Sequence, residues 1–291
     1  MPHGDVVHGD DATWGARADV APLQPVDPVE ARGAVAAMGA RVSALVRCIN
    51  HPDAPALGIW SATEVAVHLS HTVDLVTTMV RGSMAMSDDV WEFGNLTSMM
   101  VTGESERDLG AIATRIDASV ASLLTLLRDA EGDPSRPWVI GGVDFPVSTL
   151  ACHSLNELVV HGGDIARADG SPWPVERSYA ALVLRGFLFP VLGGLGRAMV
   201  DQERAAGVVA TYHVRLRGGG GAYLRFDHGE LAVSDTPPGP VDCTLLVDPM
   251  AFLMVAWGRT GQWPPILKGK LVAYGPKPWL GLELRSMLKN P

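Results

Sequence analysis

The 291-residue chain changes its hydrophobic period about two thirds of the way along. Before residue 207, apolar residues recur every three or four positions, which is the spacing of amphipathic helices. After it, apolar and polar residues alternate, which is typical of strands with one buried face. We therefore predict a helical bundle over 27–206 and an α+β domain over 207–291. Residues 1–26 are rich in Gly, Asp, Ala and Pro without a period, and they predict a flexible N-terminal arm.

Four helices are expected in the bundle. Asp27 precedes Pro28 at the first start, and Ser61 and Glu64 form a capping box at the second. The third is expected over about 106–128. Ser148 is predicted to cap the fourth, which ends before the glycine at position 170. Helix packing of this kind builds metal and ligand sites between facing helices.

The connections carry weaker signals. The stretch 84–103 contains methionines and aromatic residues without a clear period, so an irregular loop beside a pocket is expected. Two helices over 176–189 and 192–206 lead out of the bundle. In the last third, antiparallel strands are expected at 210–216, 222–226, 241–247 and 270–274, with helices at 248–257 and 279–288.

The amino-acid composition limits the classes of partner that the protein is expected to bind. The net charge of −9 disfavours nucleic acid, because neutralising phosphates requires clustered Lys and Arg. The sequence contains no run of eighteen apolar residues, and its first ten residues carry no Lys or Arg, so neither a membrane span nor a signal peptide is expected. The three cysteines lie far apart in the sequence, and we therefore expect them to be reduced thiols. We expect a cytoplasmic monomer or small homo-oligomer with no nucleic-acid or membrane partner.

The pair Glu157 and His161 is the strongest candidate for chemistry. Four residues separate them, so both project from one face of a helix, at a gap suited to two ligands of one metal ion. His68 lies in another helical stretch, on a polar stripe separate from the apolar one, and is the predicted third ligand. Two histidines and one carboxylate leave an open coordination position, as catalytic zinc sites do.

Other interpretations stay open for these residues. A Glu and a His at this spacing are more often an ordinary polar pair than metal ligands. His71 and His153 lie on the same faces and are rival ligands. Asp164 is one turn beyond His161 and can hydrogen-bond a ligating imidazole. The glycines at 162 and 163 are expected to leave room for a substrate. Nothing near Cys152 lowers its pKa, so it is not expected to be a nucleophile.

Two motifs carry a family resemblance. WSxxEVxxHL over 60–69 and NELVVHGxDIARA over 156–168 resemble the mycothiol-dependent maleylpyruvate isomerase family of DinB-like metal-dependent bundles. The resemblance covers about residues 28–195. It places the family's three metal ligands on His68, Glu157 and His161, and it implies a divalent metal, with Zn²⁺ expected, together with mycothiol.

The last third resembles a sterol-carrier-protein-2-like domain, through VDCTL over 241–245, Asp248-Pro249 and a glycine-bounded segment over 269–275. In such families this domain implies either a lipid tunnel or a cover for the metal site. Arg259, in a Gly-Arg dipeptide that the isomerase family also carries, is the candidate catalytic residue because a guanidinium binds a carboxylate with two hydrogen bonds. An ordinary surface arginine is the alternative. We expect this domain to pack over the metal site and to point Arg259 into it.

The resemblance implies an enzyme that activates a small thiol. A metal ion lowers the pKa of a coordinated thiol, and the resulting thiolate attacks an electrophilic carbon. Addition to a double bond, rotation and elimination give cis-trans isomerisation, whereas addition without elimination gives thiol S-transfer. The expected partners are a low-molecular-weight thiol and a small-molecule electrophile, with carboxylates as one candidate class. Two alternatives remain: a non-catalytic lipid or small-molecule binding protein that uses a C-terminal apolar tunnel, and a metalloprotein that uses water as the nucleophile.

Overall fold

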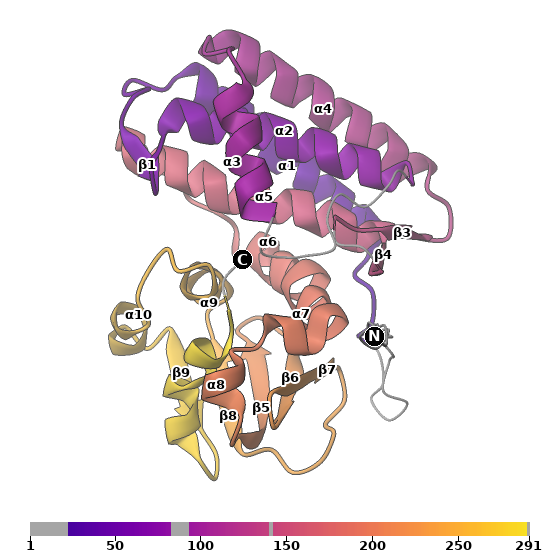
Figure 1. The fold of residues 1–291 in the computed structure, drawn as a ribbon, viewed down its shortest axis with the longest axis vertical. Coiled ribbons are helices and arrows are strands. Elements are labelled where there is room, and N and C mark those ends of the chain that lie inside the picture. The colour runs from indigo at the N-terminus through magenta and orange to yellow at the C-terminus, as the bar shows by residue number, and fades with distance from the viewer. Residues whose placement is uncertain (1–22, 83–92, 140–141, 290–291) are drawn as a thin grey trace, which may run out of the picture.

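The computed structural model describes residues 23–82, 93–139 and 142–289. Its N-terminal part is a bundle in which α1, α2, α4 and α5 share one hydrophobic core, with α3 lying against α2 (Figure 1). Two short hairpins, β1–β2 and β3–β4, flank the bundle. Residues 1–22 of the predicted arm lie outside the described residues, and Val26 at its end is buried in the core. The elements are α1 (Pro28–Arg47), β1 (Pro55–Leu57), β2 (Trp60–Ser61), α2 (Ala62–Val80), α3 (Phe93–Gly103), α4 (Leu109–Asp129), β3 (Ser135–Pro137), β4 (Asp144–Pro146) and α5 (Val147–Asp169).

The starts of α1 and α2 follow local sequence signals, and the start of α5 does not. The side chain of Asp27 accepts from the backbone N–H of Val29, and both hydrogen bonds of the capping box at the start of α2 are formed. The prediction that Ser148 caps α5 is wrong. The helix begins one residue earlier, and Asp133 from the preceding loop accepts from the backbone N–H and hydroxyl of Ser148, at 2.7 and 2.6 Å. A carboxylate distant in sequence thus satisfies the helix end.

The loop expected over 84–103 is helical in its second part. Residues 93–103 form α3, although their apolar and polar positions lack a clear helical period. Glu104 directly follows this helix and links it to α4 and α2. Its carboxylate accepts a hydrogen bond from Arg115 on α4 at 2.7 Å and lies 3.4 Å from His71 on α2. These tertiary contacts stabilise a helix that the local sequence pattern does not predict. Residues 83–92, which include Trp91, lie outside the described part of the chain.

A single helical rod replaces the two helices expected after the bundle. It comprises α6 (Arg177–Val183), the π-helical segment η1 (Leu184–Leu188) and α7 (Phe189–Leu195), and it runs from the bundle towards the sheet (Figure 1). Pro190 lies in the turn that follows η1 and has no N–H for a helical hydrogen bond. The wider π turn accommodates this proline without ending the rod. The short η2 (Gly196–Met199) and α8 (Gln202–Ala205) follow.

The C-terminal domain is a five-stranded mixed sheet in the order β7-β6-β5-β8-β9. The β5–β6, β6–β7 and β8–β9 pairs are antiparallel, as expected. However, β5 and β8 pair in parallel, because the chain passes through β6 and β7 before it returns to the centre of the sheet. The strands are β5 (Val209–Leu216), β6 (Gly221–Asp227), β7 (Glu230–Ser234), β8 (Cys243–Val247) and β9 (Leu271–Tyr274).

Helical segments cover this sheet and join it to the bundle. They are α9 (Pro249–Ala256), α10 (Trp263–Leu267), η3 (Pro278–Leu282) and η4 (Leu284–Met287). The helix expected over 279–288 is thus two 3₁₀ turns. A Cβ at Gly281 would lie 2.7 Å from Ala273 and 2.9 Å from Leu245, so the segment is pressed against the sheet and cannot form a regular amphipathic helix. Between the two parts of the fold, α9 packs on α6, and Val200 forms a bridge with Leu288.

Two helical stretches, 109–129 and 177–199, are long and apolar enough to cross a membrane by length and composition alone. Core helices of globular proteins pass the same test. In this fold, α4 packs along α1 and α2, and the α6–α7 rod packs on α5, α9 and β7. These contacts are those of core helices rather than of membrane spans.

Candidate metal centre

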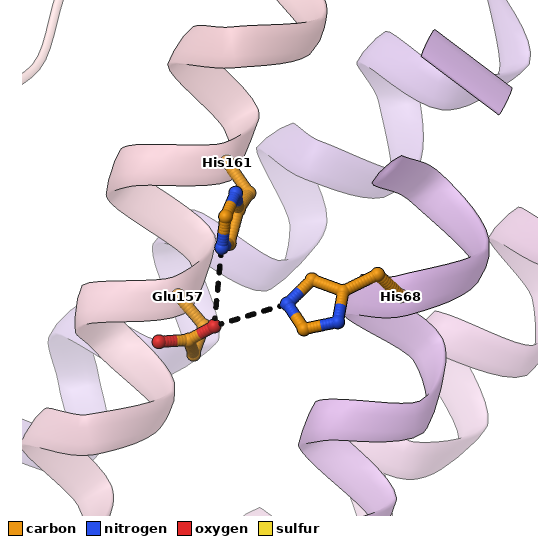
Figure 2. A group of neighbouring side chains, drawn as sticks. All are labelled: His68, Glu157 and His161. Carbon is orange, nitrogen blue, oxygen red and sulfur yellow. Dashed lines mark ion pairs between the residues drawn. The ribbon is translucent and has the colours of Figure 1, made fainter. Parts of the chain in front are cut away.

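The structure brings together the three residues that the sequence singled out as ligands. His68 projects from α2, and Glu157 and His161 project from adjacent turns of α5 (Figure 2). One carboxylate oxygen, Oε2 of Glu157, lies 3.4 Å from Nε2 of His68 and 3.4 Å from Nε2 of His161. One donor atom from each residue lies within 4.8 Å of the other two. The three donors therefore converge on one point.

Two of the three donor separations match those of a tetrahedral metal site. Ligand atoms held 2.0–2.1 Å from a tetrahedral zinc lie roughly 3.4 Å apart, which is the separation of the carboxylate oxygen from each imidazole nitrogen here. The two imidazole rings are 4.8 Å apart and nearly perpendicular, at 86°, so each directs a nitrogen inward from its own helix. Three protein donors leave one tetrahedral position for an exogenous ligand.

Burial and mutual contacts set the charges of these groups. Burial favours a raised pKa for Glu157, but hydrogen bonds to His161 and His68 outweigh it and hold the pKa well below its usual value. Burial likewise opposes protonation of His161, yet its contacts with Asp164 and Glu157 raise its pKa to about 9. For His68, burial dominates and lowers the pKa. Without a metal, the cluster thus holds one carboxylate and one imidazolium.

Asp164 orients His161. Its Oδ2 accepts from Nδ1–H of His161 at 3.0 Å, and its pKa is lowered despite burial because of this contact. The hydrogen on Nδ1 leaves Nε2 as the nitrogen that faces Glu157, which is the arrangement found when a carboxylate supports a metal-ligating histidine. The side chain of Asp164 is 1% exposed, so it requires compensating donors.

Arg259 supplies those donors from the C-terminal domain. Its Nε donates to both carboxylate oxygens of Asp164, at 3.1 and 3.0 Å, and its Nη2 lies 3.0 Å from Oδ2. Arg167 also reaches Asp164, at 3.2 Å. The candidate catalytic arginine is therefore linked to a candidate ligand through one carboxylate, and part of its hydrogen-bonding capacity is already used.

A second link, which the sequence analysis missed, leads to Glu157. Trp257 donates from its indole Nε1 to Oδ1 of Asn156 at 2.9 Å, and Nδ2 of Asn156 donates to Oε1 of Glu157 at 3.0 Å. Since Trp257 and Arg259 belong to one short segment after α9, this segment supports both ligands on α5. Only the long-range contact reveals the role of Asn156, although this residue lies within the recognised motif.

The rival histidines have other partners. His71 contacts the carboxylate of Glu104, at 3.4 Å, and is not part of the triad. His153 stacks on Phe187, with ring centroids 4.5 Å apart, and its Nδ1 accepts from the indole of Trp138. Its Nε2 lies 3.9 Å from Oε1 of Glu157, and burial lowers its pKa. His153 therefore borders the triad as a neutral side chain.

A cavity of about 380 Å³ opens onto the triad, a size typical of small-molecule sites. Its walls come from α2, α5, the η1–α7 rod and the C-terminal domain, and most of the lining is apolar. Arg259 lines it, as expected, and the C-terminal domain covers the candidate site. Residues contributed by the C-terminal domain are Ala256, Trp257, Arg259, Arg285, Leu288 and Lys289.

The structure does not support the expected role of the two glycines, because both face Trp173 and neither lines the cavity. A Cβ at Gly162 would lie 2.3 Å from the ring of Trp173, whose indole donates to the carbonyl of Val159 at 3.1 Å. Gly162 therefore makes room for a tryptophan packed on α5, not for a substrate. At Gly163 the corresponding contact with Trp173 is 3.4 Å, an ordinary packing distance.

We expect Gly162→Ala to lower the free energy of unfolding by about 1–3 kcal/mol, because the added methyl group displaces the Trp173 ring. Gly163→Ala is the matched control and should be neutral or stabilising, since alanine favours helix and meets no close contact. Urea denaturation of both variants measures the difference. Equal midpoints for the two would contradict the packing argument.

Cys152 shows no sign of reactivity. It is fully buried on α5, and burial raises its pKa above the ordinary range.

The fold and site define a helical-bundle protein with a metal-suited His-Glu-His triad under an α+β domain. Comparison with known families gives the same division. Residues 31–166 match the mycothiol maleylpyruvate isomerase N-terminal domain, and residues 195–288 match the SCP-2 sterol transfer family. Each segment is thus similar to one of these families, which confirms the resemblance found in the motifs.

One solved structure supports the same fold. A variant of the mycothiol-dependent maleylpyruvate isomerase aligns over 87% of this chain and 96% of its own, with 10% identity and a TM-score of 0.51. The unmutated isomerase aligns over the same shares, with 11% identity and a TM-score of 0.48. A search of curated protein sequences found no significant match.

Proposed function

We propose that this protein is a cytoplasmic, metal- and mycothiol-dependent enzyme that activates a small thiol for attack on an electrophile. The observation that carries the proposal is the convergence of His68, Glu157 and His161 at metal-ligand distances inside a covered cavity. The matched N-terminal domain family supports mycothiol as the thiol. We place the bundle at 27–206 and the covering domain at 207–291, after an arm over 1–26.

The residues present suit Zn²⁺ by donor type, number and spacing. When bound, a divalent ion would lower the pKa of a coordinated thiol and supply it as thiolate at neutral pH. Glu157 would provide the anionic ligand, and His68 and His161 the neutral ones. Asp164 and Asn156 hold these ligands in position, and such supporting contacts commonly change metal affinity 10- to 100-fold.

The covering domain excludes water from the reacting groups. Trp257 and Arg259 contact the residues beside the ligands, so closure of the cavity and support of the site depend on the same segment. Exclusion of water strengthens electrostatic contacts and protects a reactive adduct. A thiolate that adds to a conjugated double bond gives an adduct free to rotate, and elimination restores the double bond and the thiol. An electrophile that cannot eliminate remains bound to sulfur, which makes the same site an S-transferase.

Arg259 would receive a carboxylate of the electrophile. A guanidinium has five N–H groups. Contacts with Asp164 and with the carbonyl of Trp257 use one N–H on each of its three nitrogens, which leaves one on Nη1 and one on Nη2. Those two can bind a carboxylate while Asp164 keeps the side chain in place.

Cobalt substitution tests the thiol proposal. We expect the Co²⁺-loaded protein to gain a sulfur-to-cobalt charge-transfer band when mycothiol is added, because the thiolate would enter the fourth position. The S-methyl thioether of mycothiol, which cannot form a thiolate, is the control ligand. Absence of the band at saturating thiol would contradict thiol activation and favour water as the nucleophile.

The second candidate function is non-catalytic binding of an apolar small molecule. The observation that favours it is the apolar lining of the cavity, which lies between the bundle and the C-terminal domain. A purified protein without metal but with a bound lipid would support it. Turnover that needs both metal and thiol would support the enzyme instead.

A further inference from the structure

The cavity has a second polar feature apart from the metal triad. Arg285, on the 3₁₀ turn η4, lines its wall. Its Nε donates to the carbonyl of Val255 at 3.2 Å, and its Nη1 donates to the carbonyl of Leu288 at 2.9 Å. Of the five guanidinium N–H groups, two are therefore used and three remain. The two carbonyls hold the side chain in place without neutralising its charge.

Other charged groups around the cavity are compensated differently. Arg259 is matched by Asp164, and Glu157 is shared between two histidines. Within the described part of the chain, no carboxylate lies within ion-pair distance of Arg285, and burial alone accounts for its lowered pKa. A partly buried cation without a counter-charge is costly unless an anion is bound beside it.

The rod and the turn after it form an apolar part of the cavity wall. From the rod, the side chains that line the cavity are Phe187, Leu188, Val191, Leu192 and Leu195, and Met199 follows on η2. A small, highly polar molecule would lose hydration along this wall without gaining hydrogen bonds. An apolar chain would instead bury its surface against the wall.

We propose that the cavity binds an amphiphilic anion, with its apolar body along the η1–α7 rod and a terminal carboxylate on Arg285, separate from the carboxylate that Arg259 would receive beside the triad. This inference rests on the proposed function only in assigning the molecule as the electrophile, with its reactive carbon towards His68 and Glu157. The binding itself requires no metal. The substrate class is accordingly a dicarboxylic acid whose medium-length hydrocarbon body makes it more apolar than maleylpyruvate.

The test compares two probes of equal chain length on the full-length protein, sodium decanoate and 1-decanol, by isothermal titration. Wild-type protein should bind decanoate about 10- to 100-fold more tightly than decanol, because one charge-assisted hydrogen bond increases affinity by about this factor. Arg285→Met should remove this preference and leave decanol affinity unchanged. Arg285→Lys keeps the charge but loses the planar fork, and it should retain part of the preference. Arg225→Met, at an exposed arginine on β6, is the matched control and should behave as wild type.

His161→Ala separates this proposal from the metal proposal. The variant should keep the preference for decanoate, because Arg285 is intact. Loss of the preference in His161→Ala, with retention in Arg285→Met, would place the carboxylate at the metal and overturn the assignment. Equal binding of both probes to the wild type, or no binding of either, would also overturn it. A cobalt–thiol band in a protein that does not bind decanoate would refute only the amphiphile, and the converse result would refute only the thiol.

Discussion

His161→Ala is expected to remove most of the bound metal and to lower thiol-dependent kcat/KM by about 100-fold or more. The variant loses one of three protein donors, and even groups that only support a ligand commonly change metal affinity 10- to 100-fold. It also removes the partner that lowers the pKa of Glu157, so the remaining carboxylate binds a proton more readily. Elemental analysis of protein purified without added metal measures the first effect, and turnover with mycothiol measures the second.

His71→Ala is the control for that experiment. His71 lies one turn from His68 on α2 but contacts Glu104 instead of the triad. The His71→Ala variant should therefore retain its metal and its turnover. Far-UV circular dichroism of both variants distinguishes loss of a ligand from loss of the fold. A His161→Ala protein that keeps its full metal content would rule out the triad as the metal site.

Arg259→Met should lower kcat/KM for a carboxylate electrophile by about 30- to several thousand-fold, which corresponds to about 2–5 kcal/mol. The methionine fills a similar space but offers no N–H to the substrate. Metal content should hardly change, because Asp164 still contacts His161 and retains Arg167 as a cationic partner. Thiol affinity, measured with the cobalt protein, should also remain close to the wild-type value.

A neutral ester of the same electrophile distinguishes the two possible roles of Arg259. If the guanidinium receives the carboxylate, the variant loses activity with the acid and much less with the ester. If the guanidinium only positions Asp164, both substrates lose activity equally. Unaltered turnover of the acid by Arg259→Met would refute the role in substrate binding altogether.

Local sequence determined most of the bundle. The starts of α1 and α2 depend on capping residues within three residues of the helix end, and these residues can be recognised from the sequence alone. The pairing of Glu157 with His161 depends only on the pitch of one helix. The choice of His68 over His71 followed from the resemblance and from the polar face of α2, and the structure places His68, not His71, beside Glu157.

Tertiary structure decided the features that depend on residues distant in sequence. Asp133 replaced Ser148 at the start of α5, and β5 and β8 paired in parallel because of a crossover that strand patterns do not encode. The same holds for Gly162, whose neighbour Trp173 reaches it only through the turn after α5.

The surroundings of the site show this division most clearly. A helical pitch predicts that two side chains share a face, but not which donors approach that face from another domain. The links from Trp257 to Asn156 and from Arg259 to Asp164 span 101 and 95 residues, and Arg285 enters the cavity from the last turn of the chain. The sequence alone was therefore enough to predict the candidate ligands. The contacts from Trp257 and Arg259 and the second cation at Arg285 enter the site only because the C-terminal domain packs against the bundle.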